Sequence, residues 1–497
     1  MAASRPKTSR HIEVERKFDV LDSTVSPSFD GLSAVARVQR SPAQQLEAVY
    51  FDTPGHDLAA HRVTLRRRTG GTDAGWHLKL PAGPDTRTEV RAPLDDGLGG
   101  AVPEALTDVV AAIVRDRPLG PVARISTHRT VDVLYNPDDS PIAEFSDDKV
   151  TASAGDGEPQ QWREWELELS ESASTSTDLL DRLANRLLDA GAEPAGHGSK
   201  LARVLAGSAD DEAETDTQRD PIHRAVAEQV DQLIEWDRAV RADVYDSVHQ
   251  MRVTTRKIRS LLQSSEGAFG ISDDAWVLDE LRQLAAVLGV ARDAEVLAER
   301  YEKALAELPE DLVRGAVDKR LVDGAKRRYK SGLRRSLMAM RSARYFRLLD
   351  ALEGLVASEP PSPTGDDDGS ATASIDSAYK RVRKAAKNAS GAADDDRDEA
   401  LHRIRKGAKR LRYTAAATGE AKVSDRAKDI QSLLGDHQDS VVSRTHLSQQ
   451  AEAAHAAGED TFTYGLLYAQ EDELARKARD QLDSALKKLD KSVHKAR

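Results

Sequence analysis

Residues 11–18 read HIEVERKF, and this short alternation of charged and apolar side chains predicts the fold of the N-terminal part of the chain. Successive side chains of a β-strand point to opposite faces, so Glu13, Glu15 and Lys17 share one face while the apolar side chains of the stretch point the other way. A period of two therefore predicts a strand with one charged face and one apolar face.

Three further rows of charge follow the same alternation along the next 150 or so residues. They are Arg62, Arg66 and Arg68; Arg87, Glu89 and Arg91; and Glu164, Glu166 and Glu168. For any single row, a solvated outer sheet face is the simpler interpretation. All four rows together favour a charged interior, in which the sheet closes into a barrel around a wet tunnel and the apolar rows face outward against helices.

The chemistry of these rows points to phosphate held together with metal. Arginine offers a forked, permanently charged donor that matches phosphoryl oxygens, and lysine adds a point charge. Glutamate cannot bind phosphate directly, so its role is to hold divalent cations that bridge to phosphate. The chain has no cysteine, so carboxylates and histidine must hold any metal, and we expect Mg²⁺ or Mn²⁺.

The 497 residues exceed one ordinary core, and about 150 residues per domain suggests about three units. After about residue 220, long runs rich in Ala, Leu, Arg and Glu with a period of 3.6 predict helices to the C-terminus. Two segments rich in small and acidic residues are predicted linkers. The predicted boundaries are 8–205 for the barrel domain, 206–219 for the first linker, 220–495 for the helical domain, 220–356 and 374–495 for its halves, and 357–373 for the linker between them.

The net charge of −12 taken alone argues against a polyanionic partner. Acidic runs, however, sit in predicted linkers, whereas basic residues cluster in the periodic segments, so the local pattern is more informative. The basic N-terminus is not followed by the apolar run of a signal peptide, and no segment approaches the roughly 18 apolar residues of a membrane helix. We therefore expect a cytoplasmic protein with no membrane partner.

Two helical segments repeat one basic pattern. Residues 248–261 read VHQMRVTTRKIRSL and residues 401–414 read LHRIRKGAKRLRYT. Each places one histidine and three cations at i, i+3, i+7 and i+10, on one face of a helix, where like charges repel by a few tenths of a kcal/mol per pair. A fold that tolerates this twice is expected to meet an anion there, although a solvated basic face is the alternative. The residues are His249, Arg252, Arg256 and Arg259, and His402, Arg405, Lys409 and Arg412.

The segment LGVARD at 288–293 parallels LGDHQD at 434–439 at a similar offset, which predicts an internal duplication of a helical unit. His437 and Gln438 stand in the second copy where Ala291 and Arg292 stand in the first. The two copies are therefore not expected to be equal.

The N-terminal pattern resembles the CYTH domain, also called the triphosphate tunnel metalloenzyme fold. Its Glu-x-Glu-x-Lys signature is met by residues 13–17, and an ordered set of further motifs follows. These are Tyr50 to Thr53; Arg66 and Arg68; Trp76, Lys79, Leu80 and Pro81; Arg87, Glu89 and Arg91; Arg129, with Arg124 as the competing candidate; Asp148 to Val150; Glu164, Glu166 and Glu168; and Ser199 with Lys200.

This resemblance implies an antiparallel tunnel of eight strands that binds a triphosphate group and two metal ions. Phosphate would be bound by Lys17, Arg66, Arg68, Lys79, Arg87, Arg91, Arg129 and Lys200. Metal would be held by Glu13, Glu15, Glu89, Asp148, Glu164, Glu166 and Glu168. Catalysis would rest on Lys17, Glu164 and Glu166. One metal site would use the first two glutamates, and the second would position the attacking water near the late glutamates; we favour Glu164 and Glu166 there.

The paired histidine-bearing helices look like the CHAD domain, the conserved histidine α-helical domain, over about residues 218–495. That resemblance implies a pair of helical bundles with a basic channel for inorganic polyphosphate. The predicted fold class is multidomain α+β, with an antiparallel eight-stranded β-tunnel and helices followed by all-α duplicated helical bundles.

The resulting hypothesis is metal-dependent hydrolysis of tripolyphosphate to pyrophosphate and phosphate, with an attached polyphosphate-binding domain and an association with polyphosphate granules. Thiamine triphosphate hydrolysis, class IV-type adenylate cyclase activity and a non-catalytic polyphosphate-binding scaffold remain alternatives. Nucleic acid is not the expected partner, and the sequence leaves the oligomeric state open.

Overall fold

The computed structural model describes residues 8–97, 100–155, 157–206, 221–264, 269, 275–357, 375–391, 393–417 and 419–495. Apart from Ala206 and Ala357, the two predicted linkers lie outside these residues. The domain boundaries drawn from those linkers therefore stay predictions.

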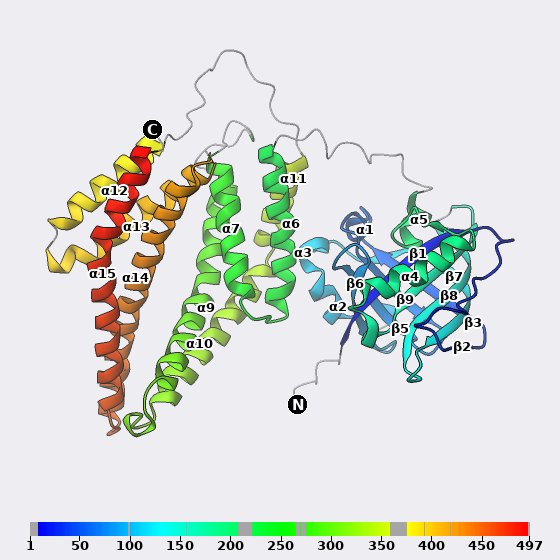
Figure 1. The fold of residues 1–497 in the computed structure, drawn as a ribbon, viewed down its shortest axis with the longest axis horizontal. Coiled ribbons are helices and arrows are strands. Elements are labelled where there is room, and N and C mark those ends of the chain that lie inside the picture. The colour runs from blue at the N-terminus through cyan, green and yellow to red at the C-terminus, as the bar shows by residue number, and fades with distance from the viewer. Residues whose placement is uncertain are drawn as a thin grey trace, which may run out of the picture. The chain divides into compact units, whose positions relative to one another are not determined.

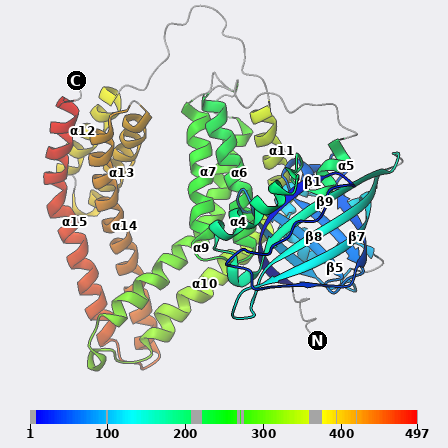
Figure 2. The same cartoon turned by 45° about the vertical axis from the view of Figure 1, so that its right-hand side comes forward.

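The N-terminal region is a closed antiparallel barrel of eight strands, which confirms the predicted fold class (Figure 1). The order around the barrel is β1-β6-β5-β4-β3-β7-β8-β9, and β9 pairs with β1 to close it. Figure 2 shows β7, β8 and β9 running side by side across the barrel wall. The strands are β1 (Ser9–Val20), β3 (Gln44–Asp52), β4 (Thr64–Thr69), β5 (Gly75–Pro81), β6 (Thr86–Ala92), β7 (Gly120–Tyr135), β8 (Pro141–Ala154) and β9 (Gln160–Leu169), with short β2 (Arg37–Arg40) on β7 and β10 (Glu193–Pro194) on β1.

Strand β1 changes partner halfway, and this closes the barrel. Its first half pairs with β6, so that Glu13 lies opposite Arg87, and its second half pairs with β9, so that Lys17 lies opposite Glu166. Because side chains alternate, the register puts the charged rows of three strands on one face, the inner one.

The outer face of β1, β8 and β9 is apolar and is covered by α4 (Thr177–Asp189). Leu179, Leu180, Leu183 and Leu187 of α4 follow a helical period and pack against a cluster that includes Phe145. Burying each such leucine contributes about 1.5–3 kcal/mol. This packing lets the opposite, polar face of the sheet form the interior.

Helix α5 (Lys200–Ala206) fills part of the barrel interior. Its residues Leu201 and Val204 pack with Ile125 of β7 and Val150 of β8. The first residue of α5, Lys200, is buried at the border between this apolar cluster and the charged part of the interior.

The C-terminal region is helical, as predicted. The helices are α6 (Pro221–Arg241), α7 (Ser247–Ser264), α9 (Trp276–Ala306), α10 (Val317–Met340), α11 (Ala343–Ala357), α12 (Ile375–Ser390), α13 (Asp394–Ala417), α14 (Ala421–Ala456) and α15 (Phe462–Lys495), while α1 (Asp57–Ala60), α2 (Glu104–Val109) and α3 (Ala111–Val114) belong to the barrel region. The chain divides into two compact units, Met1–Ala285 with Leu337–Pro360 and Ala286–Ser336 with Pro361–Arg497. Within the described residues, no helix has the length and apolar character needed to cross a membrane.

Candidate functional site

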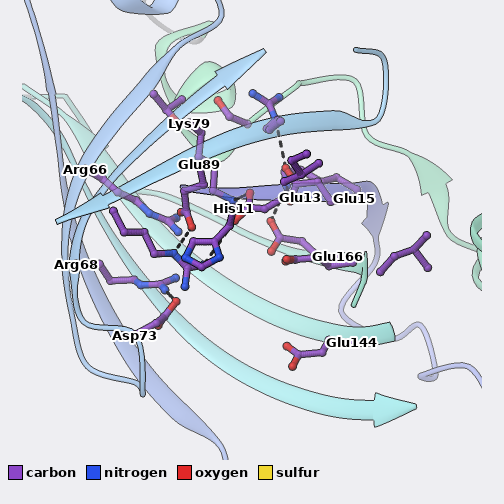
Figure 3. Close-up of a pocket in the computed structure, with 18 of the residues that line it drawn as sticks. His11, Glu13, Glu15, Arg66, Arg68, Asp73, Lys79, Glu89, Glu144 and Glu166 are labelled. Atoms are coloured by element: carbon purple, nitrogen blue, oxygen red, sulfur yellow. Dashed lines mark hydrogen bonds and ion pairs between the residues drawn. The ribbon is translucent and has the colours of Figure 1, made fainter. Parts of the chain in front are cut away.

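A cavity of about 410 Å³ lies inside the barrel and is lined mainly by charged side chains (Figure 3). The structure brings most of the predicted site residues together in it, because the alternation of each strand points them inward. Those lining it are Glu13, Glu15, Lys17, Arg66, Arg68, Lys79, Arg87, Glu89, Arg91, Arg129, Glu166, Glu168 and Lys200. The other two predicted residues, Asp148 and Glu164, are buried directly behind the lining, where both contact Lys200.

The first acidic pair is held by lysines. Glu15 pairs with Nζ of Lys17 at 2.5 Å, and Glu13 pairs with Nζ of Lys79, also at 2.5 Å. Burial would raise the pKa of Glu15, but the positive charges of Lys17 and Lys79 outweigh it and lower that pKa to about 2. Burial raises the pKa of Glu13 despite Lys79. Two adjacent carboxylates of one strand therefore differ in how readily they stay ionised.

The late acidic residues form a tighter cluster around one ammonium group. Carboxylate oxygens of Asp148, Glu164 and Glu166 lie within 4.8 Å of one another. Nζ of Lys200 lies 2.8 Å, 2.7 Å and 2.8 Å from the three, respectively. Arg129 adds a two-pronged contact to Asp148 at 2.7 and 2.6 Å and also pairs with Glu166.

This cluster could hold a divalent metal. Three convergent carboxylates are the all-oxygen set that hard divalent cations prefer, and the cluster already accommodates a cation, the ammonium of Lys200. Glu168, by contrast, is not part of the cluster. Burial raises its pKa to about 7; Lys79 opposes this, and Glu13, Glu15 and Glu166 reinforce it.

The guanidinium groups of Arg66, Arg68 and Arg129 lie near one another, and Arg129 also contacts the carboxylate cluster. Burial, with the charges of Arg66 and Arg129 nearby, lowers the pKa of Arg68 to about 9. Nη1 of Arg66 donates to the hydroxyl oxygen of Tyr50 at 3.2 Å, and its Nε is buried without a hydrogen-bond partner. Among the described lysines and arginines that line the cavity, Arg66 is the one whose direct partner is a hydroxyl and not a carboxylate. An anion that binds here would offset the repulsion among the three guanidinium groups and would accept a hydrogen bond from Nε of Arg66.

Glu89 is enclosed more tightly than the other predicted metal-binding glutamates. Its Oε1 lies 2.8 Å from Nδ1 of His77, its Oε2 pairs with Arg91, and both Glu89 and His77 are only 1% exposed. His77 was not predicted as a site residue, although it stands two residues before Lys79 on β5 and therefore points to the same face. Asp73, which pairs with Arg68, was also missed because a loop residue has no periodic signal.

The structure changes one arginine assignment from the sequence and agrees with another. Arg62 does not extend the row of Arg66 and Arg68, because β4 begins at Thr64 and Arg62 is exposed with a left-handed φ of 55°. Thr64 takes the inward position instead. Of the two competing candidates on β7, Arg129 lines the cavity, whereas Arg124 is exposed and does not.

The two basic helix faces have the same relationship to their cores. On α13, Leu401, Ile404, Ala408 and Leu411 form a buried stripe, and each predicted basic residue follows one member of it. His402, Arg405, Lys409 and Arg412 are therefore half-buried beside the core. On α7, a buried stripe of Val248, Met251, Thr255 and Ile258 precedes His249, Arg252, Arg256 and Arg259 in the same way.

Several donors on these faces are unused. Nε of Arg405, Nε of Arg259 and Nδ1 of His402 are buried without a hydrogen-bond partner among the described residues. Burial, Lys406 and Arg405 lower the pKa of His402. Arg252, in contrast, donates from Nε to the carbonyl of Ala285 at 3.2 Å. The two helices belong to different compact units, so each face is a separate candidate anion surface.

Family models match both halves of the chain. The model of the CYTH domain matches residues 11–189, and that of the CHAD domain matches residues 224–448. An uncharacterized protein of Mycobacterium tuberculosis, matched in two strains, is 64% identical over 515 residues, with 100% of both chains covered.

Solved structures show weaker similarity. A CHAD domain from the plant Ricinus communis covers 53% of this chain and 90% of its own, with 23% identity and a TM-score of 0.42. A Hippeastrum protein described as having a dominant triphosphatase activity covers 39% of this chain and 95% of its own, with 16% identity and a TM-score of 0.25.

Proposed function

The chain belongs to the proteins in which a CYTH domain is followed by a CHAD domain, and on this premise we propose that it is a metal-dependent triphosphatase. Its proposed reaction is hydrolysis of inorganic tripolyphosphate to pyrophosphate and phosphate. We further propose that its helical region binds inorganic polyphosphate.

The convergence of Arg66, Arg68 and Arg129 in one cavity, where Arg129 also contacts a carboxylate cluster, carries this proposal. Buried cations that repel one another are stabilised by a polyanion, and each charge-assisted contact contributes about 1.5–3 kcal/mol. The carboxylates of Asp148, Glu164 and Glu166 distinguish the site from a simple anion pocket, because they suit a divalent cation that accompanies the phosphates.

In the proposed reaction, the basic residues of the cavity would bind the phosphates and the acidic residues would hold the metal. Arg66, Arg68 and Arg129 would hold phosphoryl oxygens and stabilise charge that develops as the anhydride bond breaks. Lys17 and Lys79 would neutralise the remaining oxygens. Asp148, Glu164 and Glu166 would hold Mg²⁺ or Mn²⁺, with a further site at Glu13 and Glu15. The metal supplies neutralisation of phosphate charge and polarisation of the attacked phosphorus centre.

The character of the lining supports an inorganic substrate over the nucleotide and thiamine alternatives. Among the described residues that line the cavity, the only benzene-type ring belongs to Tyr50, which is 3% exposed and engaged by Arg66. Recognition of a base or a thiamine ring needs an apolar or aromatic surface with a few polar groups. No such surface is evident in the described lining, whereas charged groups for phosphate are abundant.

A phosphate-release screen of the purified full chain tests the proposal. Tripolyphosphate, ATP, thiamine triphosphate and long-chain polyphosphate would each be assayed with Mg²⁺ and with Mn²⁺. We expect the highest kcat/KM for tripolyphosphate, and we expect no phosphate release from any substrate in EDTA. Faster phosphate release from thiamine triphosphate would favour the thiamine alternative, and formation of cyclic AMP and pyrophosphate from ATP would favour the cyclase. Binding of triphosphate without any turnover would favour the scaffold.

A further inference from the structure

The counter-ion of Arg68 differs from those of the other cavity cations because it comes from a loop. Arg68 pairs with Asp73, which lies in the turn between β4 and β5 and lines the cavity (Figure 3). The pairs of Lys17 with Glu15, Lys79 with Glu13 and Arg129 with Asp148 each join residues of the barrel strands. Asp73 therefore supplies a negative charge that the barrel wall does not provide at this position.

The backbone holds Asp73 in place independently of its ion pair. The turn begins with Gly70 and Gly71 at φ values of +80° and +74°, and a Cβ on Gly70 would lie 2.2 Å from the carbonyl oxygen of Gln45. Only glycine fits this approach. Nε2 of His77, which is 1% exposed, lies 2.9 Å from the carbonyl oxygen of Asp73, so the buried ring contacts the backbone of the turn. The carboxylate is thus delivered to Arg68 by a fixed turn.

The two partners differ in their access to water. The side chain of Arg68 is 7% exposed, whereas that of Asp73 is 36% exposed. Moving Asp73 away leaves its charge solvated, but Arg68 would remain buried beside Arg66 and Arg129, which requires another anion. The arrangement suits exchange of one anion for another at a cation that stays in place.

We propose that Asp73 stands in for a phosphoryl group at Arg68 and is displaced when the substrate binds, so that it sets the affinity of the cavity for triphosphate. The nature of the incoming anion rests on the proposed function. Because displacement of Asp73 opposes binding, neutralising this residue strengthens binding. If Asp73 instead positioned Arg68 for the substrate, neutralising it would weaken binding.

The test measures binding of tripolyphosphate to the full chain in EDTA, where turnover does not interfere, by titration calorimetry. We expect Asp73→Asn to lower Kd by about five- to tenfold, since tenfold corresponds to about 1.4 kcal/mol. In the metal-loaded assay KM falls by a similar factor and kcat does not rise, because tighter ground-state binding does not speed the chemical step. Asp73→Ser repeats the test if thermal unfolding shows that Asp73→Asn is destabilised.

Two matched variants separate this role from a general change in charge. Glu144→Gln removes an equal charge from an exposed carboxylate that lines the same cavity, and we expect a much smaller gain. In an Arg68→Gln background, Asp73→Asn should lose its effect, because the two side chains act as one pair. An equal gain in Glu144→Gln, or a gain that persists without Arg68, would overturn the proposal.

The remaining outcomes distinguish this inference from the proposed function. Unchanged or weaker binding in Asp73→Asn overturns the role of Asp73, whatever the enzyme hydrolyses. Tight binding of tripolyphosphate without phosphate release overturns the triphosphatase proposal and leaves the role of Asp73 standing. A wild-type chain that neither binds tripolyphosphate in EDTA nor releases phosphate from it with Mg²⁺ or Mn²⁺ overturns both.

Discussion

The ammonium nitrogen of Lys200 lies 2.8 Å from Oδ2 of Asp148, joining the first residue of α5 to the middle of β8. The same nitrogen contacts Glu164 and Glu166, so one lysine contacts all three carboxylates of the cluster. Removing a partner from such a buried group leaves uncompensated charge, which typically costs about 3–5 kcal/mol.

Lys200→Met should therefore destabilise the chain strongly in EDTA and should recover more stability than the wild type when Mg²⁺ or Mn²⁺ is added. A divalent cation would replace the lost ammonium among the three carboxylates. Thermal unfolding with and without metal measures both effects. Lys149→Met, at an exposed neighbouring position of β8, is the control. A variant as stable as the wild type in EDTA would contradict the expectation.

Glu13→Gln and Glu15→Gln should each abolish turnover while leaving the fold intact. Both side chains are buried in the cavity wall, and glutamine keeps their volume but is a far weaker ligand for a hard cation. Phosphate release and circular dichroism would be measured for each, with the exposed loop residue Glu158→Gln as the control. Normal activity of both variants at saturating Mg²⁺ would show that no metal is held there.

Arg66→Ala and Arg68→Ala should each reduce kcat/KM by an amount equivalent to about 1.5–3 kcal/mol, the contribution of a charge-assisted hydrogen bond. Replacement by lysine should rescue only part of the loss, because lysine lacks the fork. Arg67→Ala, between them on the opposite face of β4, is the matched control and should have little effect. Unchanged kcat/KM in both alanine variants would mean that these arginines do not contact the substrate.

Glu168→Gln should stabilise the metal-free chain at alkaline pH. Its pKa is about 7 in the folded chain, above the ordinary 4.5, so the stability that depends on its protonation is complete below about pH 4.5 and is lost as pH rises through 7. Glutamine has no carboxylate to ionise and so avoids this loss of stability, which is about 3 kcal/mol. Unfolding in denaturant at several pH values should show an advantage that grows from pH 4.5 to 7 and then levels off. A constant difference would refute the assignment.

Reversing charge on both basic helix faces should weaken binding of long polyphosphate and reduce its salt dependence. Each cation that contacts a polyanion releases counter-ions, so its loss lowers the slope of affinity against salt. The variant is Arg252→Glu with Arg405→Glu in the full chain. Lys257→Glu with Arg410→Glu, exposed on the same two helices, is the control. Titration of labelled polyphosphate at several salt concentrations measures the effect, and tripolyphosphate turnover should remain nearly unchanged. Equal affinity in both double variants would identify these faces as solvated surface.

Local periodicity was sufficient to predict the barrel and most of its lining. The alternation at Glu13, Glu15 and Lys17 depends only on the geometry of one strand, and the closed sheet confirms its inward face. The same rule fails at Arg62, because the strand starts two residues later and a left-handed residue breaks the alternation. The residue at which a strand begins depends on the preceding turn, and turns have no periodic pattern from which that residue could be predicted.

Periodicity along the chain was enough to predict which residue types gather: a period of two places the charged rows on one strand face, and the helical spacing places the basic residues of each repeat on one helix face. Which charges meet depends on the folded domain. Lys200 reaches Asp148 because α5 enters the barrel, and Asp73 reaches Arg68 because two glycines fold the turn back. Such pairings depend on the register of β1 with two partners and on the path of loops, which are set by packing of the whole domain rather than by any local run of residues.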